Sequence, residues 1–272
     1  MIKYSGNTIT GMYYSGYTIV RAYGCGGELV FGEEPTPPTP TDGKLKYVIS
    51  GQTYTMPCDG NPLLTRLDIS RDVYSRGLPL SDVSAITSVE VGSCVTKLDN
   101  NVFNAFYSLS AATCANSVIS IGYDAFSVCC NLTSFNIPSG VTAVSDYMFS
   151  SCSGLTSVTI PSVVATIGID AFEECLSLWD IVIPSGITSI GDFAYQSDYY
   201  TQEPWRTKMI EMNNNRTVTI LATTPPTLGD GVFSIMDDTT DYATYPIYVP
   251  AESVNAYKSA WSVYSNRIFP IE

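Results

Sequence analysis

The most informative absence in this sequence is histidine, of which there is none. Histidine is the side chain that most often serves as a general base near neutral pH, and it is the commonest metal ligand. The sequence also lacks a nucleophile elbow, a phosphate-binding loop and a dinucleotide-binding fingerprint. We therefore expect a protein that is not an enzyme and that has neither a cofactor nor a metal centre.

Positive charge and long apolar runs are also scarce. Thirteen basic residues stand against 26 acidic ones, which gives a net charge of −13. A chain this acidic has no broad basic surface for nucleic acid, and an anionic membrane surface would repel it. No apolar run approaches the ~20 residues of a membrane-spanning helix, so we expect no membrane insertion. The opening MIKYSGNTITGMYYSG lacks the apolar core of a signal peptide, which predicts either export by another route or a leader replaced by a new Met1.

What the sequence does contain is a repeat with a period of 23 residues. Four segments align without a gap, namely Val95–Ser117, Val118–Gly140, Val141–Val163 and Val164–Gly186, and a fifth begins at Ile187. An earlier segment, Asp72–Cys94, keeps only the second half of the pattern. Equivalent positions hold similar side chains, as in the set Phe103, Phe126, Phe149, Phe172 and Tyr195. Because one unit cannot bury its own apolar side, we expect the units to stack around a common core.

The apolar spacing within a unit indicates a short strand. In Leu155-x-x-Val158-x-Ile160 the last positions alternate with a period of two, which is typical of a strand with one buried face. Pro161 follows and ends the strand, because proline has no N–H to donate. A turn and a second apolar stretch then bring the chain back on the opposite side. The pattern predicts a β-rich solenoid.

These residues resemble the leucine-rich repeats of the BspA-like bacterial surface-antigen type. The residues that carry the resemblance are Ile167-Gly168, Ala171-Phe172, Cys175, Leu178, Ile181, Ile183 and Pro184. The likeness extends from Asp72 to Glu272, with Leu221–Phe233 and Ile247–Trp261 similar to closing units, although Cys114 and Ala115 depart from it. The resemblance implies a right-handed leucine-rich-repeat stack with a parallel sheet on its concave side. It also implies adhesion or ligand binding more often than catalysis.

The remaining segments predict the domain organisation. Residues 1–33 contain a second repeat with a period of ten, which we interpret as a small β module for docking or oligomerisation, the alternative being a mobile tail. This segment weakly resembles short N-terminal segments on phage structural proteins. We expect a proline-rich linker over residues 34–43, an N-terminal β cap with a hairpin over 44–71, the solenoid over 72–246, and a C-terminal capping unit with a short helix over 247–272. A homo-oligomer is expected.

Cysteines form a column of their own in the repeat. Cys129, Cys152 and Cys175 are 23 residues apart, so they lie on neighbouring strands and within disulfide range. Their position suits a small apolar side chain, so buried free thiols are favoured over a disulfide or a zinc site. Cys25, Cys58 and Cys94 show no pattern that suggests a partner. Cysteine usage therefore leaves the redox compartment open.

Two features interrupt the Ser- and Thr-rich outer face that the repeat predicts. The first is Trp179, with Asp180 and Val182 on the same strand, because exposed tryptophan is enriched in binding hot spots. The second is an insertion, roughly Gln196–Met209, which carries Tyr199, Tyr200, Trp205 and Arg206. Aromatic and arginine side chains on a loop over a rigid scaffold suit recognition. The alternative is that the loop folds over Trp179 and the aromatic side chains only pack together.

Two further interpretations complete the prediction. The run Asp237–Asp241 could bind calcium, but a solvated turn is favoured because the spacing differs from an EF-hand loop.

As a whole, the sequence predicts a recognition protein of a bacteriophage virion, active in host attachment or in capsid or tail decoration. The alternatives are a bacterial cell-surface adhesin and an intracellular scaffold. The expected partners are a protein or glycan on a host cell surface, and other virion or surface proteins that contact residues 1–33.

Overall fold

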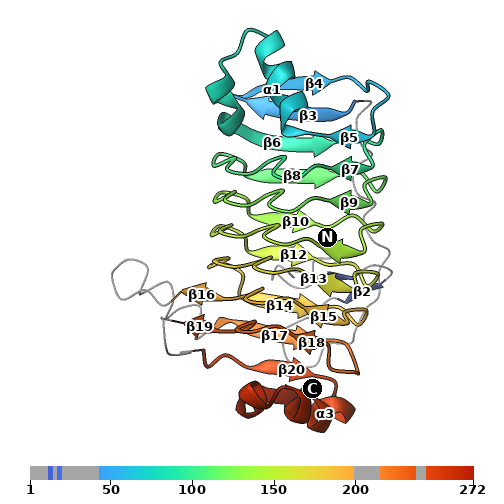
Figure 1. Cartoon of the computed structure of the whole chain (residues 1–272), viewed down its shortest axis with the longest axis vertical. Helices are drawn as coiled ribbons and strands as arrows, with labels where there is room; N and C mark the ends of the chain where they lie inside the picture. Colours follow the sequence, from blue (N-terminus) through green and yellow to red (C-terminus); the bar gives the residue numbers. More distant parts are fainter. Residues whose placement is uncertain (1–11, 15–16, 20–42, 199–214, 237–242) are drawn as a thin grey trace, which may run out of the picture.

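The repeating part of the chain winds into a stack of coils, as its period predicts (Figure 1). A computed structural model describes residues 12–14, 17–19, 43–198, 215–236 and 243–272. One side of the stack carries the longer strands: β6 (Ile86–Val91), β8 (Ala111–Cys114), β10 (Ser134–Asn136), β12 (Ser157–Thr159), β14 (Asp180–Ile183), β17 (Thr217–Ile220), β20 (Ile247–Val249) and β21 (Ile268–Pro270). Neighbouring strands run parallel and in register, so that Phe135 pairs with Val158 one repeat later. The predicted β-rich solenoid with parallel sheets is confirmed.

A second row of parallel strands follows the longer strands along the chain, after Pro138, Pro161 and Pro184 in three of the coils. These strands are two residues long: β5 (Leu63–Leu64), β7 (Lys97–Leu98), β9 (Ser120–Ile121), β11 (Ala143–Val144), β13 (Thr166–Ile167), β15 (Ser189–Ile190) and β18 (Thr227–Leu228). Val144 pairs with Ile167, and Ile167 pairs with Ile190. Residues at equivalent repeat positions therefore pair with one another in successive coils.

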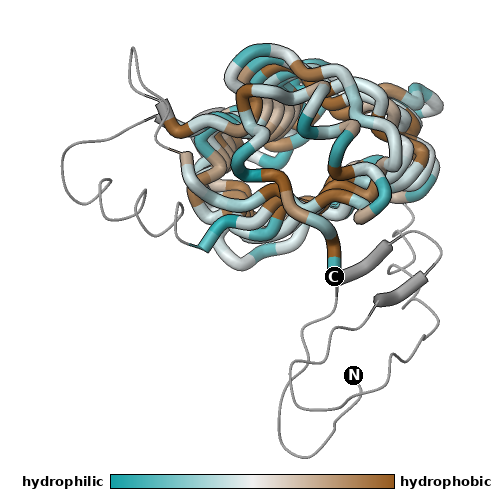
Figure 2. The backbone as a smooth tube through the Cα atoms, turned by 90° about the horizontal axis from the view of Figure 1, so that it is seen from below, coloured by the Kyte–Doolittle hydropathy of each residue, from teal (hydrophilic) through white to brown (hydrophobic). Residues whose placement is uncertain are grey.

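The third side of each coil is a turn whose backbone also bonds to the next coil. The N–H groups of Asp124, Phe126 and Val128 donate to the carbonyls of Asp146, Met148 and Ser150 at 3.1, 3.0 and 2.8 Å. Asp124 and Val128 have positive φ values of 55° and 61°, which lets alternate N–H groups point along the stack. The short pair β16 (Ser197–Asp198) and β19 (Ile235–Met236) continues this side. Seen along the stack, the coils superimpose (Figure 2).

A column of aromatic rings fills the core. The rings of Phe126, Phe149, Phe172 and Tyr195 are stacked, with centroids 5.6, 5.4 and 4.9 Å apart along the column. Phe103 extends the column at one end and Phe233 at the other, at 5.1 and 5.7 Å. Residues at equivalent repeat positions thus share one environment, as the sequence predicts.

The cysteine column consists of free thiols, as predicted. Cys129, Cys152 and Cys175 are buried and are not in disulfides. Each Sγ donates to the carbonyl oxygen of the aromatic-column residue one coil earlier, Phe103, Phe126 and Phe149, at 3.3, 3.0 and 3.2 Å. Burial raises the pKa of Cys129 and Cys175 to about 12. The thiols are therefore held neutral and satisfy carbonyls in the core.

The first coil is covered by a cap that contains the predicted hairpin and a helix that the sequence analysis missed. Strands β3 (Leu45–Ile49) and β4 (Gln52–Met56) form an antiparallel hairpin, and β3 also pairs antiparallel with β6. Helix α1 (Arg66–Ser75) begins with a capping box in which Thr65 and Asp68 exchange hydrogen bonds. The 3-10 helix η1 (Leu80–Ala85) then leads into β6. The domain boundaries proposed above stay predictions.

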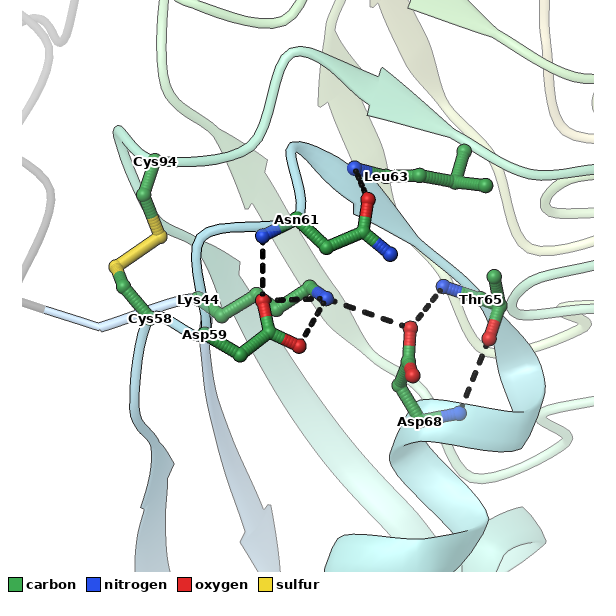
Figure 3. A network of polar contacts seen from close by, with 8 residues as sticks. All are labelled: Lys44, Cys58, Asp59, Asn61, Leu63, Thr65, Asp68 and Cys94. Atoms are coloured by element: carbon green, nitrogen blue, oxygen red, sulfur yellow. Dashed lines mark hydrogen bonds and ion pairs between the residues drawn. A yellow bond between two sulfur atoms is a disulfide. The ribbon is translucent and has the colours of Figure 1, made fainter.

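A disulfide and a buried lysine hold this cap together (Figure 3). Cys58 is bonded to Cys94, with their Cα atoms 6.2 Å apart. The sequence showed no pattern that suggested a partner for these two cysteines, and the cap fold brings them together. The fully buried Lys44 Nζ lies 3.0 Å from Asp59 Oδ2 and 3.5 Å from Asp68 Oδ2. The Lys44 ammonium lowers the pKa of Asp59, so this carboxylate stays charged beside it.

The opposite end of the stack is closed by helices. The chain continues through η2 (Ala251–Ser253), α3 (Val254–Ala260), which is the expected short helix, and η3 (Ser262–Arg267) before β21. Tyr257 Oη and Trp261 Nε1 donate to the carbonyls of Ala222 and Pro226, at 2.7 and 3.0 Å. These bonds tie the closing helix to the last coils.

Near the N-terminus, β1 (Met12–Tyr14) and β2 (Tyr17–Ile19) form an antiparallel pair.

Candidate functional site

The outer face of the longer strands is a flat surface of small polar side chains. Its central column contains Thr113, Asn136, Thr159, Val182 and Thr219, and a second column contains Ala111, Ser134, Ser157, Asp180 and Thr217. Hydroxyl groups bond along the stack: Thr159 Oγ1 donates to Asn136 Oδ1 at 2.8 Å, and Thr217 Oγ1 donates to Asp180 Oδ1 at 2.8 Å. This side of the stack is therefore hydroxyl-rich and well ordered.

Trp179 is a large aromatic residue at the edge of this face, whose central column continues from Thr219 to Tyr248 and Phe269. It directly precedes β14, and 37% of its surface is exposed. Its Nε1 donates to the carbonyl of Leu176 at 3.3 Å, and its own carbonyl accepts from Thr217 N. Asp180 is exposed beside it, whereas Val182 is half-buried. The indole is thus held by a hydrogen bond at Nε1 and is partly exposed.

The insertion meets the described part of the chain close to Trp179. Tyr199, Tyr200, Trp205 and Arg206 lie outside the described residues, as does Asp237–Asp241. The chain returns from the insertion at Arg216 and Thr217, immediately beside the Leu178–Trp179 backbone. The base of the insertion and Trp179 therefore belong to one region of the surface.

Arg216 anchors this region and was not foreseen from the sequence. Only 1% of its surface is exposed. Its guanidinium donates to the carbonyls of Leu178, Tyr195 and Cys175 at 3.1, 3.2 and 3.2 Å, and it lies over the Tyr245 ring at 5.4 Å. Arginine is rarely buried unless it is paired, so a lone arginine before a strand gave no signal of this role.

Nowhere in the described ranges do three or more histidine, cysteine or acidic side chains lie close enough to hold a metal ion. Among the same residues, no helix has the length and apolar character required to cross a membrane.

Comparison with known proteins identifies the repeat. Residues 81–201 match the BspA type leucine rich repeat region in six copies. This segment is therefore a BspA-type leucine-rich repeat region, as the resemblance in the sequence implied. Proteins with leucine-rich repeats typically bind other molecules and do not catalyse reactions, and BspA-type repeats belong to bacterial surface proteins. A search of curated proteins found no match.

Solved structures with similar repeats come from three bacteria. A leucine rich repeat protein of T. pallidum is 23% identical over 53% of this chain and 72% of its own, with a TM-score of 0.39. A leucine-rich repeat protein from Bacteroides ovatus is 18% identical over 67% of this chain and 47% of its own, with a TM-score of 0.41. A leucine rich cell surface protein from Faecalibacterium prausnitzii is 16% identical over 98% of this chain and 96% of its own, with a TM-score of 0.30.

The family match bears on the three settings that the sequence left open, namely a virion, a bacterial cell surface and an intracellular scaffold. It agrees with a bacterial surface protein, and the comparisons contain nothing that favours a virion protein. The likeness of residues 1–33 to phage structural proteins has no counterpart among the matches.

Proposed function

We propose that this protein is a non-enzymatic adhesin of a bacterial cell surface, which binds a protein or glycan through the outer face of its longer strands. The observation that carries this proposal is the partly exposed, rigidly held Trp179 on a surface of small hydroxyl groups. A tryptophan that is already fixed loses little conformational entropy on binding, and its large ring buries much apolar area. The expected contact is therefore centred on Trp179.

The side chains around Trp179 supply the polar part of the contact. Asp180 offers a carboxylate, and Val182 adds a small apolar surface one position further along the strand. In this proposal the insertion residues Tyr199, Tyr200, Trp205 and Arg206 also take part in binding. Tyrosine, tryptophan and arginine are the residue types enriched in interfaces, which supports a binding role for the loop.

The disulfide supports a location outside the cytoplasm. Cys58–Cys94 joins the cap to the first coil, and such bonds persist in oxidising compartments and are rare in the reducing cytosol. The buried thiols of the cysteine column are compatible with this location, because burial keeps them neutral and unreactive. Within this proposal, residues 1–33 attach the solenoid to other surface proteins or to further copies of the chain.

The test is a binding assay with matched variants. We expect the full-length protein to bind at least one member of an array of purified glycans and extracellular host proteins. Trp179→Ala should weaken this binding at least about tenfold, as for a hot-spot residue, with no change in the melting temperature. Tyr74→Ala removes a more exposed aromatic side chain on α1 and should leave binding unchanged. Binding that persists in Trp179→Ala, or a loss of stability in that variant, would show that Trp179 only packs.

A further inference from the structure

A second surface lies on a different side of the stack, at the corner where each coil leaves its short strand. Two consecutive positions form this corner in every coil. The first position holds Tyr123, Asp146, Ile169 and Asp192, and the second holds Asp124, Tyr147, Asp170 and Phe193. We call these eight residues the corner stripe. Backbone bonds of 3.1, 2.8 and 3.0 Å from Asp124, Tyr147 and Asp170 to the next coil hold the two positions in line.

Apolar and acidic residues alternate in the corner stripe. Each coil has one apolar residue and one aspartate, and their order reverses from one coil to the next, which gives a pattern with twice the basic period. The side chains of Tyr123, Tyr147, Ile169 and Phe193 are between 38% and 48% exposed. Neighbouring coils are ~4.8 Å apart, so these four side chains form a continuous exposed row along the stack. Solubility alone does not explain such a row, since contiguous exposed apolar surface marks interaction sites.

The acidic side chains in the stripe are held in fixed positions. Asp146 Oδ1 accepts from Ile169 N at 2.8 Å, and Asp192 Oδ1 accepts from Asp230 N at 2.9 Å. Glycine at the position before each donor is required, because a Cβ on Gly168 or Gly229 would lie 2.3 or 2.1 Å from the same carboxylate oxygen. One oxygen of each carboxylate is thus bound, and the second has no bond among the described residues. These carboxylates are preorganised for a ligand.

Within the described ranges, no lysine or arginine forms an ion pair with an aspartate of the stripe. Between Lys97 and Arg206 the chain contains no lysine or arginine. The ion pairs that join two described residues lie within residues 44–90, in the cap and first coil. Burial, with repulsion from Asp192 and Asp146, raises the pKa of Asp170, which also bonds to the Tyr147 hydroxyl. A cation placed on the stripe would relieve this repulsion.

We propose that the corner stripe is a docking surface for an extended, lysine- or arginine-rich segment of a partner protein. The row of rings and the isoleucine accept the alkyl stems of such side chains, and tyrosine and phenylalanine faces attract the cationic heads. Asp146 and Asp192 then receive the charges, whereas Asp170 is buried and bonded to the Tyr147 hydroxyl. A neutral glycan would use the rings but not the carboxylates, and a bare metal ion would use the carboxylates but not the rings. A basic peptide uses both.

The probe that tests this docking is a nona-arginine peptide, with a serine–glycine peptide of equal length as the neutral comparison. We expect the full-length protein to bind the arginine peptide and not the neutral one. Affinity should fall between low salt and about 0.15 M salt, because exposed charge pairs are screened. Equal binding of the two peptides, or binding of neither, would overturn the proposal.

Variants separate docking on the stripe from general attraction to an acidic protein. Asp146→Asn combined with Asp192→Asn keeps a side-chain Oδ1 that accepts from the backbone N–H groups of Ile169 and Asp230, and removes two charges. This double variant should raise the dissociation constant about tenfold. Glu252→Gln combined with Glu272→Gln removes two exposed charges at the C-terminal end and should raise it less than about twofold. Residue 147 has a positive φ, which asparagine adopts readily, so Tyr147→Asn should keep the backbone conformation. This variant leaves the net charge unchanged and should still weaken binding of the arginine peptide several-fold. Equal effects of the two charge variants would mean that net charge alone attracts the peptide.

A calcium titration and the Trp179 variant complete the design. If calcium binds saturably and this binding is lost in the Asp146→Asn, Asp192→Asn variant, the stripe is a metal site and not a docking surface for a protein. That result would overturn the proposal. Trp179→Ala should bind the arginine peptide as the unmodified protein does. Failure of the adhesin proposal and failure of this one are therefore distinguishable, since each depends on a different surface.

Discussion

At the scale of single residues, each ring inside the aromatic column stacks on its equivalents in the coils before and after it. Phe149 lies between Phe126 and Phe172, and Cys152 bonds to the carbonyl of Phe126. A substitution therefore alters two interfaces between coils at once. The same repetition means that one exposed residue, such as Trp179, stands out against uniform neighbours.

Replacing Phe149 by alanine should lower the free energy of unfolding by about 3–5 kcal/mol, the usual effect of removing a buried phenylalanine side chain. The ring is fully buried, and both of its stacking partners would lose contact. Guanidinium unfolding followed by circular dichroism measures this. Phe269→Ala, at an exposed position of β21, is the control and should change stability by no more than about 0.5 kcal/mol. Similar losses in both variants would contradict the stacked-column description.

The buried thiols predict a specific dependence of stability on alkaline pH. The pKa of Cys175 is raised from 9.0 to about 12 in the folded state, chiefly by burial. The unfolded chain releases this proton first, so stability should be unaffected below pH 9 and should decline as pH rises from 9 towards about 12. Cys175→Ala should reduce this decline, which urea unfolding across the pH range would reveal. In the native protein at pH 8, iodoacetamide should label Cys175 only after unfolding; rapid native labelling would argue against its burial.

At the scale of elements, the pieces of this fold are too small to be stable alone. Strands of two residues such as β9 and β13 hold only because each coil provides the next with hydrogen-bond partners. The ends of the stack need other devices. At the N-terminal end these are the β3–β4 hairpin, helix α1 and the Cys58–Cys94 disulfide.

Removing the disulfide should destabilise the cap. The bond closes a loop of 36 residues, for which chain entropy predicts a contribution of about 4 kcal/mol. We expect Cys58→Ser combined with Cys94→Ser to lower the denaturation midpoint accordingly, and reduction of the unmodified protein to have the same effect. Cys130→Ser, which replaces a half-buried free cysteine, serves as the control. Identical midpoints with and without the bond would mean that packing alone holds the cap.

At the scale of the whole molecule, the stack behaves as a series of equal units between two different ends. Each coil contacts mainly its neighbours, so the number of coils is not fixed by the geometry of any one of them. What must be preserved is the alignment of equivalent repeat positions in successive coils. Each cap only has to pack against the terminal coil with its strand aligned to the strand of that coil.

Deleting one complete unit, 141–163, should therefore leave a folded protein with cooperative unfolding. The deletion joins Gly140 to Val164, and every apolar column continues without a shift. The denaturant m-value should fall in proportion to the surface lost. Deleting 141–152 instead removes half a coil and should abolish cooperative unfolding, because strands and turns would then face each other. If the variant that lacks 141–152 still folds and unfolds cooperatively, the stack does not depend on the alignment of successive coils.

Much of the fold and part of the candidate site followed from periodicity. The aromatic and cysteine columns, the strands ending before Pro138, Pro161 and Pro184, and the exposure of Trp179 were all predictable, because a repeated residue repeats its environment. Helix α1 and the buried Arg216 were not predictable in this way. Both lie in segments that occur once, where no second copy reveals which face is buried.

The sequence by itself determined that the chain would coil, which side chains would fill the core, and which would face solvent. Apolar residues that recur at a constant interval are all buried only when the repeat units stack on one another. Only the tertiary structure decided which unrepeated residues meet: Cys58 with Cys94, Lys44 with two aspartates, and Arg216 with three carbonyls beneath Trp179. It also placed acidic and apolar residues alternately along one corner. Such contacts depend on the path by which the chain closes each coil, and the period alone does not specify that path.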